Sequence, residues 1–310
     1  MRVLLPGGGV CVAASPRPHG RASPPDPSGR PPVVAPAVRF SPSTVCGALR
    51  SALTHSFCLP VGGVMTTVSE EFPAAYSTSH AEIYEFIHSA RGRDWAAEAD
   101  DYVRLVRERN STASSLLDVA SGTGAHLARF AEHFDRAEGL ELSEGMRALS
   151  RAKLPDVPVH AGDMRDFHLG STYDAVVCLC FSLSYTRDVD ELRAAAFAMS
   201  RHLSPGGVLI VEPWWFPEKF IDGFVSASLA EQQGRAVSRL SHTVREGRTS
   251  RMEVRYTVAD QRGIQDFTEY EVLSLFTEQE YAAAFADAGC PVEYHPGGPN
   301  GRGLFVGVRQ

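Results

Sequence analysis

The sequence predicts an α/β fold in which a doubly wound, mostly parallel sheet carries an antiparallel ribbon inserted after its fifth strand. Apolar strand-like runs alternate with amphipathic helical runs from residue 77 to residue 213, which is the pattern of βαβ units. The strand expected at 114–121 leads through a glycine turn directly into a helix. After Pro213, three strand-like runs follow one another with only polar turns between them. The last observation predicts the ribbon.

The individual elements follow from apolar spacing along the chain. The expected helices cover residues 79–88, 93–109, 126–134, 143–153, 190–203 and 278–289. The expected parallel strands cover 114–121, 137–143, 157–163, 173–181 and 208–213. The ribbon strands are expected at 235–247, 249–260 and 266–277, and a closing hairpin at 292–309. Ser143 is a suitable N-cap for the fourth helix. Ligands of such a sheet bind at the carboxyl ends of its strands.

The first 64 residues differ from the rest in composition. They hold eleven of the twenty prolines, six arginines, one acid and no lysine. Such a segment buries too little apolar surface to offset its ordering entropy. We expect it to lie outside the fold, either as a disordered arm or as an extension upstream of a true start at Met65. The expected domain is therefore 65–310, with the ribbon at 214–276 covering a substrate site.

Charge and cysteine content exclude several classes of protein. The formal net charge is −7, which argues against general nucleic-acid binding. No apolar run reaches about 18 residues, so no transmembrane helix or membrane partner is expected. The six cysteines lie at irregular spacing without a CxxC pair. Free thiols in the cytoplasm are expected, and no metal site.

The glycine turn predicts the cofactor. A lone glycine turn also occurs in NAD enzymes, whose fingerprint is GxGxxG. Here Asp118 precedes Gly122 and Gly124, and the third glycine is missing. This order resembles motif I of the Rossmann-like class I S-adenosylmethionine-dependent methyltransferases. The glycines let the backbone approach a ligand closely, and an acid at the strand end suits an ammonium group.

Two further acids agree with this resemblance. Glu141 ends the second strand, where a carboxylate can take both ribose hydroxyls. Asp163 follows the third strand, where it can accept from the adenine amino group, and Met164 would cover the adenine face. Each acid also has a structural interpretation, as a helix-start charge or a turn residue, but the coincidence of three acids at one sheet edge favours binding. The resemblance adds the cofactor contacts Ala120, Leu142, Met146 and Cys180, and the aromatic residues Tyr84 and Trp95, which suit a sulfonium.

More specific motifs narrow the acceptor. The runs EPWWFPE at 212–218 and GGPNGRGLF at 297–305 closely resemble the dTDP-aminosugar N,N-dimethyltransferases that complete desosamine and mycaminose in macrolide pathways. The similarity extends from about Tyr76 to the end of the chain. It implies that the 3-amino group of a dTDP-linked deoxysugar is methylated twice in antibiotic biosynthesis. The presence of a hydroxyl at C4 of the sugar stays open.

The same resemblance assigns the substrate side. Arg302 matches the arginine that reaches the phosphates, for which a forked guanidinium is suited. Substrate contacts are also implied for Tyr76, Ser182, Trp214, Trp215, His242, Arg245 and Arg251. Relatives read MFSSIGY or MFSSIGH where this chain has LCFSLSY, so Tyr185 keeps the ring position while the neighbouring residues differ. We therefore expect the differences from relatives to affect how the sugar ring is recognised and not the methyl transfer itself.

The chemistry expected here needs an unprotonated amine in line with an activated methyl group. Tyr185 and Tyr76 are expected to orient the amine, and no single residue is expected to be an essential base, because phenols titrate near pH 10.

Three alternatives remain open: a methyltransferase for another small amine or hydroxyl, an NAD-dependent nucleotide-sugar dehydrogenase or epimerase, and a non-catalytic binding protein. A homodimer is the expected oligomeric state.

Overall fold

The computed structural model describes residues 77–310, so the expectations for residues 1–64 and for Tyr76 lie outside the described residues. The helices are α1 Thr78–Ala90, α2 Trp95–Arg109, α3 Ala125–His133, α4 Glu144–Lys153, α5 Val189–Arg201 and α6 Glu278–Asp287, with the 3₁₀ helix η1 Ser182–Tyr185. The strands are β1 Ser115–Val119, β2 Arg136–Glu141, β3 Val159–Ala161, β4 Tyr173–Cys178, β5 Leu203–Val211, β6 Phe224–Gln232, β7 Arg235–Glu246, β8 Thr249–Asp260, β9 Gly263–Ser274, β10 Val292–His295 and β11 Leu304–Val308. Every predicted element is present.

Local chemistry explains where the helices begin. Most are capped by a side-chain oxygen that accepts an amide hydrogen of the first turn; the caps are Ser77, Asp94, Ser143, Asp188 and Thr277. The cap predicted at Ser143 is confirmed, since its hydroxyl accepts from the amide of Met146 at 3.4 Å. Helix α3 differs because it begins at a glycine, Gly124, which has no side-chain cap.

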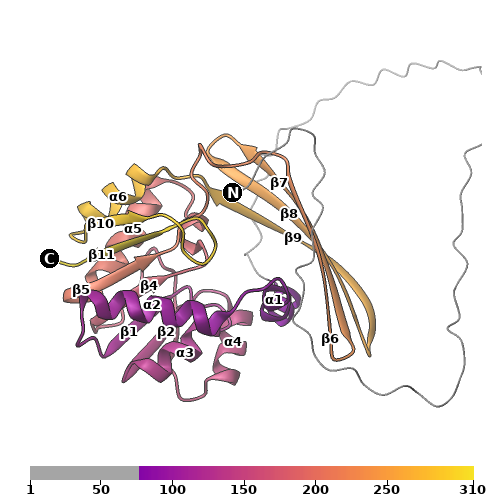
Figure 1. Ribbon diagram of the computed structural model, residues 1–310, viewed down its shortest axis with the longest axis horizontal. Coiled ribbons are helices and arrows are strands. Elements are labelled where there is room, and N and C mark those ends of the chain that lie inside the picture. Colours follow the sequence, from indigo (N-terminus) through magenta and orange to yellow (C-terminus); the bar gives the residue numbers. More distant parts are fainter. Residues whose placement is uncertain (1–76) are drawn as a thin grey trace, which may run out of the picture. The chain divides into compact units, whose positions relative to one another are not determined.

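The main sheet has seven strands in the order β10-β11-β5-β4-β1-β2-β3 (Figure 1). Strands β1 to β5 pair in parallel, and β11 and β10 pair antiparallel at one edge. The prediction of a doubly wound, mostly parallel sheet with a closing hairpin is therefore confirmed. Because the order reverses at β1, the carboxyl ends of β1 and β4 form the switch point where such folds bind ligands.

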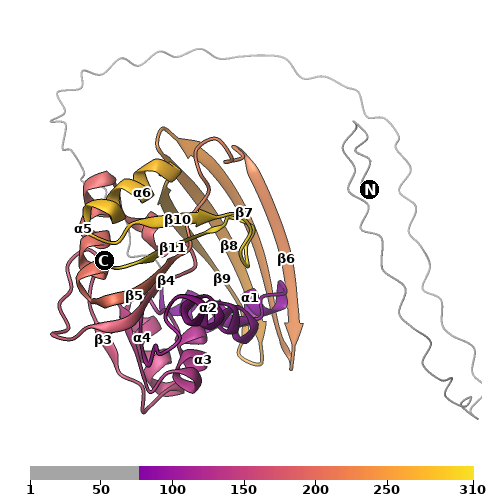
Figure 2. The ribbon, with the colours of Figure 1, turned by 60° about the vertical axis from the view of Figure 1, so that its left-hand side comes forward.

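Helices cover both faces of this sheet (Figure 2). On one face, α5 and α6 pack through residues such as Leu192, Met199 and Phe285. On the other, α2 and α3 pack through Tyr102 and Phe130. This burial of apolar surface on both sides is what a parallel sheet requires.

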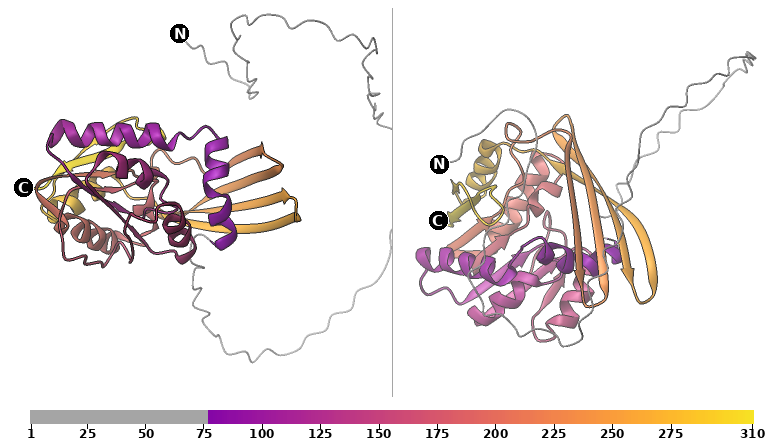
Figure 3. Two further views of the ribbon diagram at one scale, coloured as in Figure 1. Left: turned by 90° about the horizontal axis from the view of Figure 1, so that it is seen from below. Right: turned by 45° about the vertical axis from the view of Figure 1, so that its right-hand side comes forward.

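A second sheet, which we call sheet B, has the order β6-β7-β8-β9 and is antiparallel throughout. Three of its strands were predicted, and the edge strand β6 was missed because Val225 and Leu229 point outward and disturb the expected pattern. The helix α1 packs Ile83 and Ile87 onto its inner face, and Figure 3 shows α1 lying across the strands.

Within residues 77–310, no helix is long and apolar enough to cross a membrane. The same residues contain no group of three or more histidine, cysteine or acidic side chains arranged to hold a metal ion.

Candidate functional site

The turn after β1 passes through three residues with left-handed backbone. Ala120, Gly122 and Gly124 have φ values of 59°, 57° and 73°. A Cβ on Gly124 would collide with Ser150 of α4. No atom lies within 4 Å of the place that a Cβ on Gly122 would take, so the backbone there stays open to a ligand.

Glu141 holds this turn against the end of β2. Its two carboxylate oxygens accept the amides of Gly122 and Ser143, each at 2.7 Å. Burial raises the pKa of Glu141, and these amide donors oppose the shift. Burial also raises the pKa of Asp118, at the end of β1, well above its usual range, and the charge of Glu141 adds to this effect. A cationic ligand group beside Asp118 would favour its ionised form.

The remaining residues predicted to contact the cofactor follow the neighbouring strands. Asp163 follows β3, and its carboxylate accepts the amide of Arg165 at 2.9 Å. Met164 packs half-buried against the core, Met146 is buried in α4, and Leu142 is exposed. Cys180 follows β4 with a φ of 54°. Because β1 to β4 are parallel, these positions share one edge of the sheet.

The junction of α1 and α2 adds aromatic rings. Tyr84 and Trp95 lie with their ring centroids 5.9 Å apart. The guanidinium of Arg93 lies 4.2 Å from the centre of the Trp95 ring and pairs with Glu98 at 2.7 Å. His126 also contacts Glu98, at 3.0 Å, and is buried, so it packs within the fold.

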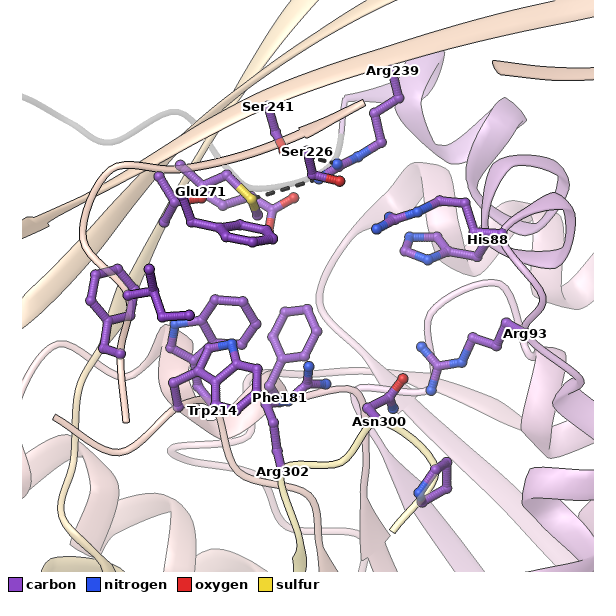
Figure 4. Close-up of a pocket in the computed structure, with 18 of the residues that line it drawn as sticks. His88, Arg93, Phe181, Trp214, Ser226, Arg239, Ser241, Glu271, Asn300 and Arg302 are labelled. Carbon is purple, nitrogen blue, oxygen red and sulfur yellow. Dashed lines mark hydrogen bonds between the residues drawn. The ribbon is translucent and has the colours of Figure 1, made fainter. Parts of the chain in front are cut away.

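A cavity of about 460 Å³ lies between the main sheet and sheet B (Figure 4). Four residues that the sequence analysis assigns to ligand contacts line it: Tyr84, assigned to the cofactor, and Trp214, Trp215 and Arg302, assigned to the substrate. Its volume falls within the range of small-molecule sites.

The helix η1 carries Ser182, predicted to contact the substrate, and Tyr185, predicted to orient the amine. The Ser182 hydroxyl donates to the carbonyl of Leu179 at 2.8 Å. The side chain of Tyr185 is hydrogen-bonded to the carboxyl of Glu271 on β9, and Glu271 lines the cavity. Burial raises the pKa of Glu271. Tyr185 therefore reaches the cavity through an acid that the sequence did not indicate.

Glu212, just after β5, connects three segments and was not recognised from the sequence. It is 1 % exposed and accepts the amide of Cys180 at 2.8 Å, the side-chain amide of Asn300 at 2.6 Å, and a guanidinium nitrogen of Arg302 at 2.8 Å. Its hydrogen-bond partners lie 32 to 90 residues away along the chain, and the guanidinium of Arg93 lies 4.0 Å from its carboxylate, so no local pattern indicates them.

Arg302 is consequently already paired. Besides its ion pair with Glu212, its Nε donates to the carbonyl of Pro213 at 3.2 Å. Its guanidinium lies 4.9 Å from the ring centre of Phe181 and 5.2 Å from that of Trp214. It therefore fixes the aromatic wall of the cavity.

The ribbon residues predicted from the resemblance do not lie in the cavity. His242 is exposed on the outer face of β7, Arg251 pairs with Glu246 at 2.7 Å, and Arg245 donates to the carbonyls of Gly247 and Pro217. The two-residue period of a strand turns His242 and Arg251 outward. Arg245 has the parity of the inward residues, but it lies at the end of β7 and its guanidinium is held by these carbonyls.

The opposite positions of sheet B face inward and line the cavity instead; they are Ser226, Arg239, Ser241, Thr243, Met252, Tyr256 and Glu271. In a strand every second residue faces the same side. The apolar Val237 faces inward, so this period would also have placed Arg239 on the inner face.

Comparison with known proteins agrees with this geometry. The family model described as a methyltransferase domain matches residues 116–207. The dTDP-4-amino-2,3,4,6-tetradeoxy-D-glucose N,N-dimethyltransferase of Saccharopolyspora spinosa is 60% identical over 79% of this chain and 100% of the relative. The dTDP-3-amino-3,4,6-trideoxy-alpha-D-glucopyranose N,N-dimethyltransferase of Streptomyces venezuelae is 53% identical over 75% of this chain and 99% of the relative.

Among solved structures, that of an amino pentose methyltransferase of Micromonospora echinaspora with S-adenosylmethionine bound is 51% identical, with a TM-score of 0.70, and the match covers 74% of this chain and 97% of that one. The acids and the open glycine turn fit this cofactor, which the protein uses. The chain belongs to the family of S-adenosylmethionine-dependent dTDP-aminosugar N,N-dimethyltransferases.

Proposed function

We propose that this protein methylates the amino group of a dTDP-linked amino-deoxyhexose twice, in the biosynthesis of an antibiotic. The observation that carries the proposal is the cavity, which lies beside the cofactor edge and has the volume and the cationic side chains that a nucleotide sugar needs. Sheet B, within residues 214–276, covers this acceptor site, and residues 65–310 form the catalytic domain.

The position of the amine is the finer part of the proposal. The sequence motifs imply an amine at C3, as in the substrate named for the Streptomyces venezuelae relative. The relative at 60% identity is named for a 4-amino sugar. An amine at C4 is therefore the second candidate, favoured by this higher identity.

In the proposed cofactor site, Asp118 faces the ammonium group, Glu141 takes the ribose hydroxyls, Asp163 takes the adenine amino group, and Met164 covers the adenine. Leu142 and Met146 complete the adenosine side. Tyr84, Trp95 and Cys180 lie toward the methionine end. When bound, the cofactor supplies a methyl group on a sulfonium that needs no further activation.

The protein contributes alignment to the transfer. Holding an amine in line with the methyl group accounts for several kcal/mol of the barrier, up to about 7–11 in well-oriented intramolecular cases. Tyr185 and Tyr76 orient the amine, with Ser182, Trp214 and Trp215 around the sugar. Water can take the proton of the acceptor amine before the amine binds. The free amine then needs no dedicated base.

The variant Tyr185→Phe tests this view of proton transfer. We expect kcat to stay within about tenfold of the wild type, because the hydroxyl positions the amine through Glu271 and does not remove its proton. Steady-state kinetics at saturating cofactor give kcat and KM, with Tyr270→Phe, an exposed residue of β9, as the matched control. A loss of about 10³-fold in kcat at unchanged KM would make Tyr185 the base.

We also propose that the protein works as a homodimer in the cytoplasm. Val225, Leu229 and Leu240 are exposed on the outer face of sheet B, where strand pairing places them near one another, and exposed apolar patches of this kind mark interaction surfaces. The free thiols of Cys178, Cys180 and Cys290 fit a reducing compartment. Sedimentation should show a dimer that Leu229→Glu with Leu240→Glu converts to a monomer, and a monomeric wild type would refute the dimer.

An acceptor panel tests the function as a whole. The purified protein is incubated with S-adenosylmethionine and a dTDP-3-aminosugar, a dTDP-4-aminosugar, simple amines or small hydroxyl compounds, and the products are weighed by mass spectrometry. We expect products with one and then two added methyl groups from a dTDP-aminosugar alone. Efficient methylation of the simple acceptors would support the alternative, a methyltransferase for another small amine or hydroxyl.

A further inference from the structure

Phe181 occupies a strained position between the cofactor edge and the acceptor cavity. Its φ is 55°, in the left-handed region, where a bulky side chain is rarely found. The preceding residue, Cys180, has a φ of 54°, and its amide donates to Glu212 at 2.8 Å. Backbone strain of this kind is retained mainly at functional sites, where it sets the direction of a side chain. Here Phe181 lines the cavity, and Figure 4 shows its ring beside Trp214 and Arg302.

Phe181 is also the part of the cavity wall that belongs to the cofactor edge. Of the described residues that line the cavity, it alone comes from residues 110–211, the segment between α2 and the end of β5. It lies three residues beyond β4, and β4 pairs with β1, whose turn holds the open glycine at 122. The ring therefore lies where the acceptor must meet the cofactor, and the part of the acceptor that it contacts is the sugar that carries the amine.

The surface around this ring is apolar. The ring centroid of Phe181 lies 4.7 Å from that of Trp214. Polar hydrogens beside it are already engaged within the protein, since the Ser182 hydroxyl donates to a backbone carbonyl at 2.8 Å and the indole N–H of Trp214 donates to the hydroxyl of Ser250 at 3.0 Å. A sugar hydroxyl placed against the ring would lose its hydrogen bonds to water without gaining a partner there. A CH₂ group in the same place would be buried favourably.

We propose that Phe181 is a specificity-determining residue, which selects aminosugars that lack ring hydroxyls on the side facing it. The inference rests on the proposed function, since it takes the acceptor to be a dTDP-aminosugar. It applies to an amine at C3 or at C4, because it concerns the other ring carbons and not the amine.

The opposite side of the cavity has the contrasting chemistry. Ser241 and Glu271 line it from sheet B, and Figure 4 shows them across the cavity from Phe181. The sugar therefore meets one apolar wall and one polar wall. Its deoxygenated side lies on Phe181, and its polar groups face sheet B, so the contrast between the walls also orients the ring.

A pair of acceptors tests the proposal on the full chain. One is dTDP-4-amino-2,3,4,6-tetradeoxyglucose, which has no free ring hydroxyl, and the other is dTDP-4-amino-4,6-dideoxyglucose, which has two; the corresponding pair with the amine at C3 covers the other amine position. We expect the wild-type kcat/KM to be about 30–100-fold higher for the deoxygenated sugar, which is the discrimination that an apolar pocket achieves against an added hydroxyl. Phe181→Asn should reduce this ratio to about fivefold or less, because asparagine tolerates a left-handed backbone and replaces the apolar surface with a polar one.

Two further variants separate the outcomes. Phe181→Leu keeps an apolar side chain and should keep the ratio within about threefold of the wild type. Phe197→Ser, which replaces an exposed ring of α5, should leave both kcat/KM values unchanged. S-adenosylhomocysteine should bind every variant within about threefold of the wild type, which confirms folding. Equal kcat/KM values of the wild type for the two sugars, the wild-type ratio in Phe181→Asn, or an equal loss of the ratio in Phe181→Leu and Phe181→Asn would overturn the inference. A wild type that methylates no dTDP-aminosugar would instead refute the proposed function.

Discussion

Glu212→Gln should lower the free energy of unfolding by about 3–5 kcal/mol, the range observed when one partner of a buried ion pair is removed. The substitution leaves Arg302 without its counter-charge. This loss is costly because the side chain of Arg302 is only 10% exposed. The new amide group also presents hydrogens to the amide of Cys180 or to Asn300, both of which donate to Glu212 in the structure. For a protein of this size, the melting temperature should fall on the order of 10 °C.

Urea denaturation measures this effect. Glu218→Gln is the matched control, because Glu218 is exposed in the same segment, and its effect should stay within about 0.5 kcal/mol. The double variant Glu212→Gln with Arg302→Gln should be less destabilised than the sum of the two single variants, since neither charge is then left alone. Strict additivity, or wild-type stability of Glu212→Gln, would show that the pair does not hold the loops together.

Glu141→Gln should weaken the binding of S-adenosylhomocysteine about 100-fold. The carboxylate braces the glycine turn through Gly122 and caps the next segment through Ser143, and we propose that it also takes both ribose hydroxyls. Hydrogen bonds to a charged group contribute about 1.5–3 kcal/mol each. Calorimetry should find dTDP binding unchanged, because Glu141 does not line the acceptor cavity.

An analogue without the 2′-hydroxyl separates the two roles of Glu141. If the carboxylate contacts the ribose, removing the 2′-hydroxyl should weaken binding to the wild type. The same removal should then weaken binding to Glu141→Gln only slightly. Glu144→Gln, exposed three residues later, should bind both ligands as the wild type does. An analogue that loses equal affinity for the wild type and for Glu141→Gln would limit Glu141 to bracing the turn.

The sequence predicts the parts of the site that depend on neighbouring residues. Asp118 and Gly122 belong to one strand and its turn, and Glu141 ends the next strand, so short-range patterns locate them. The parallel order of the strands then brings them to one edge. The glycine at 124 is required both by its φ of 73° and by the closeness of Ser150.

The acceptor side was predicted less well, because it depends on long-range contacts. Both faces of sheet B mix polar and apolar residues, so composition did not decide between His242 and Arg239, which lie on opposite faces. The partners of Glu212 come from distant loops that only the closed fold brings together. The edge strand β6 was missed because an edge needs less burial than an inner strand.

The central claim is that the methyl acceptor is an aminosugar recognised through its nucleotide diphosphate. The most direct measurement compares kcat/KM for one dTDP-aminosugar and for the same aminosugar without the nucleotide, with the products identified by mass. The account predicts a doubly methylated product from the dTDP-linked sugar and a kcat/KM lower by about 10³-fold or more for the free sugar, since binding energy from the remote nucleotide is lost. Equal kcat/KM values for the two acceptors, or a product that stops at one methyl group, would contradict it.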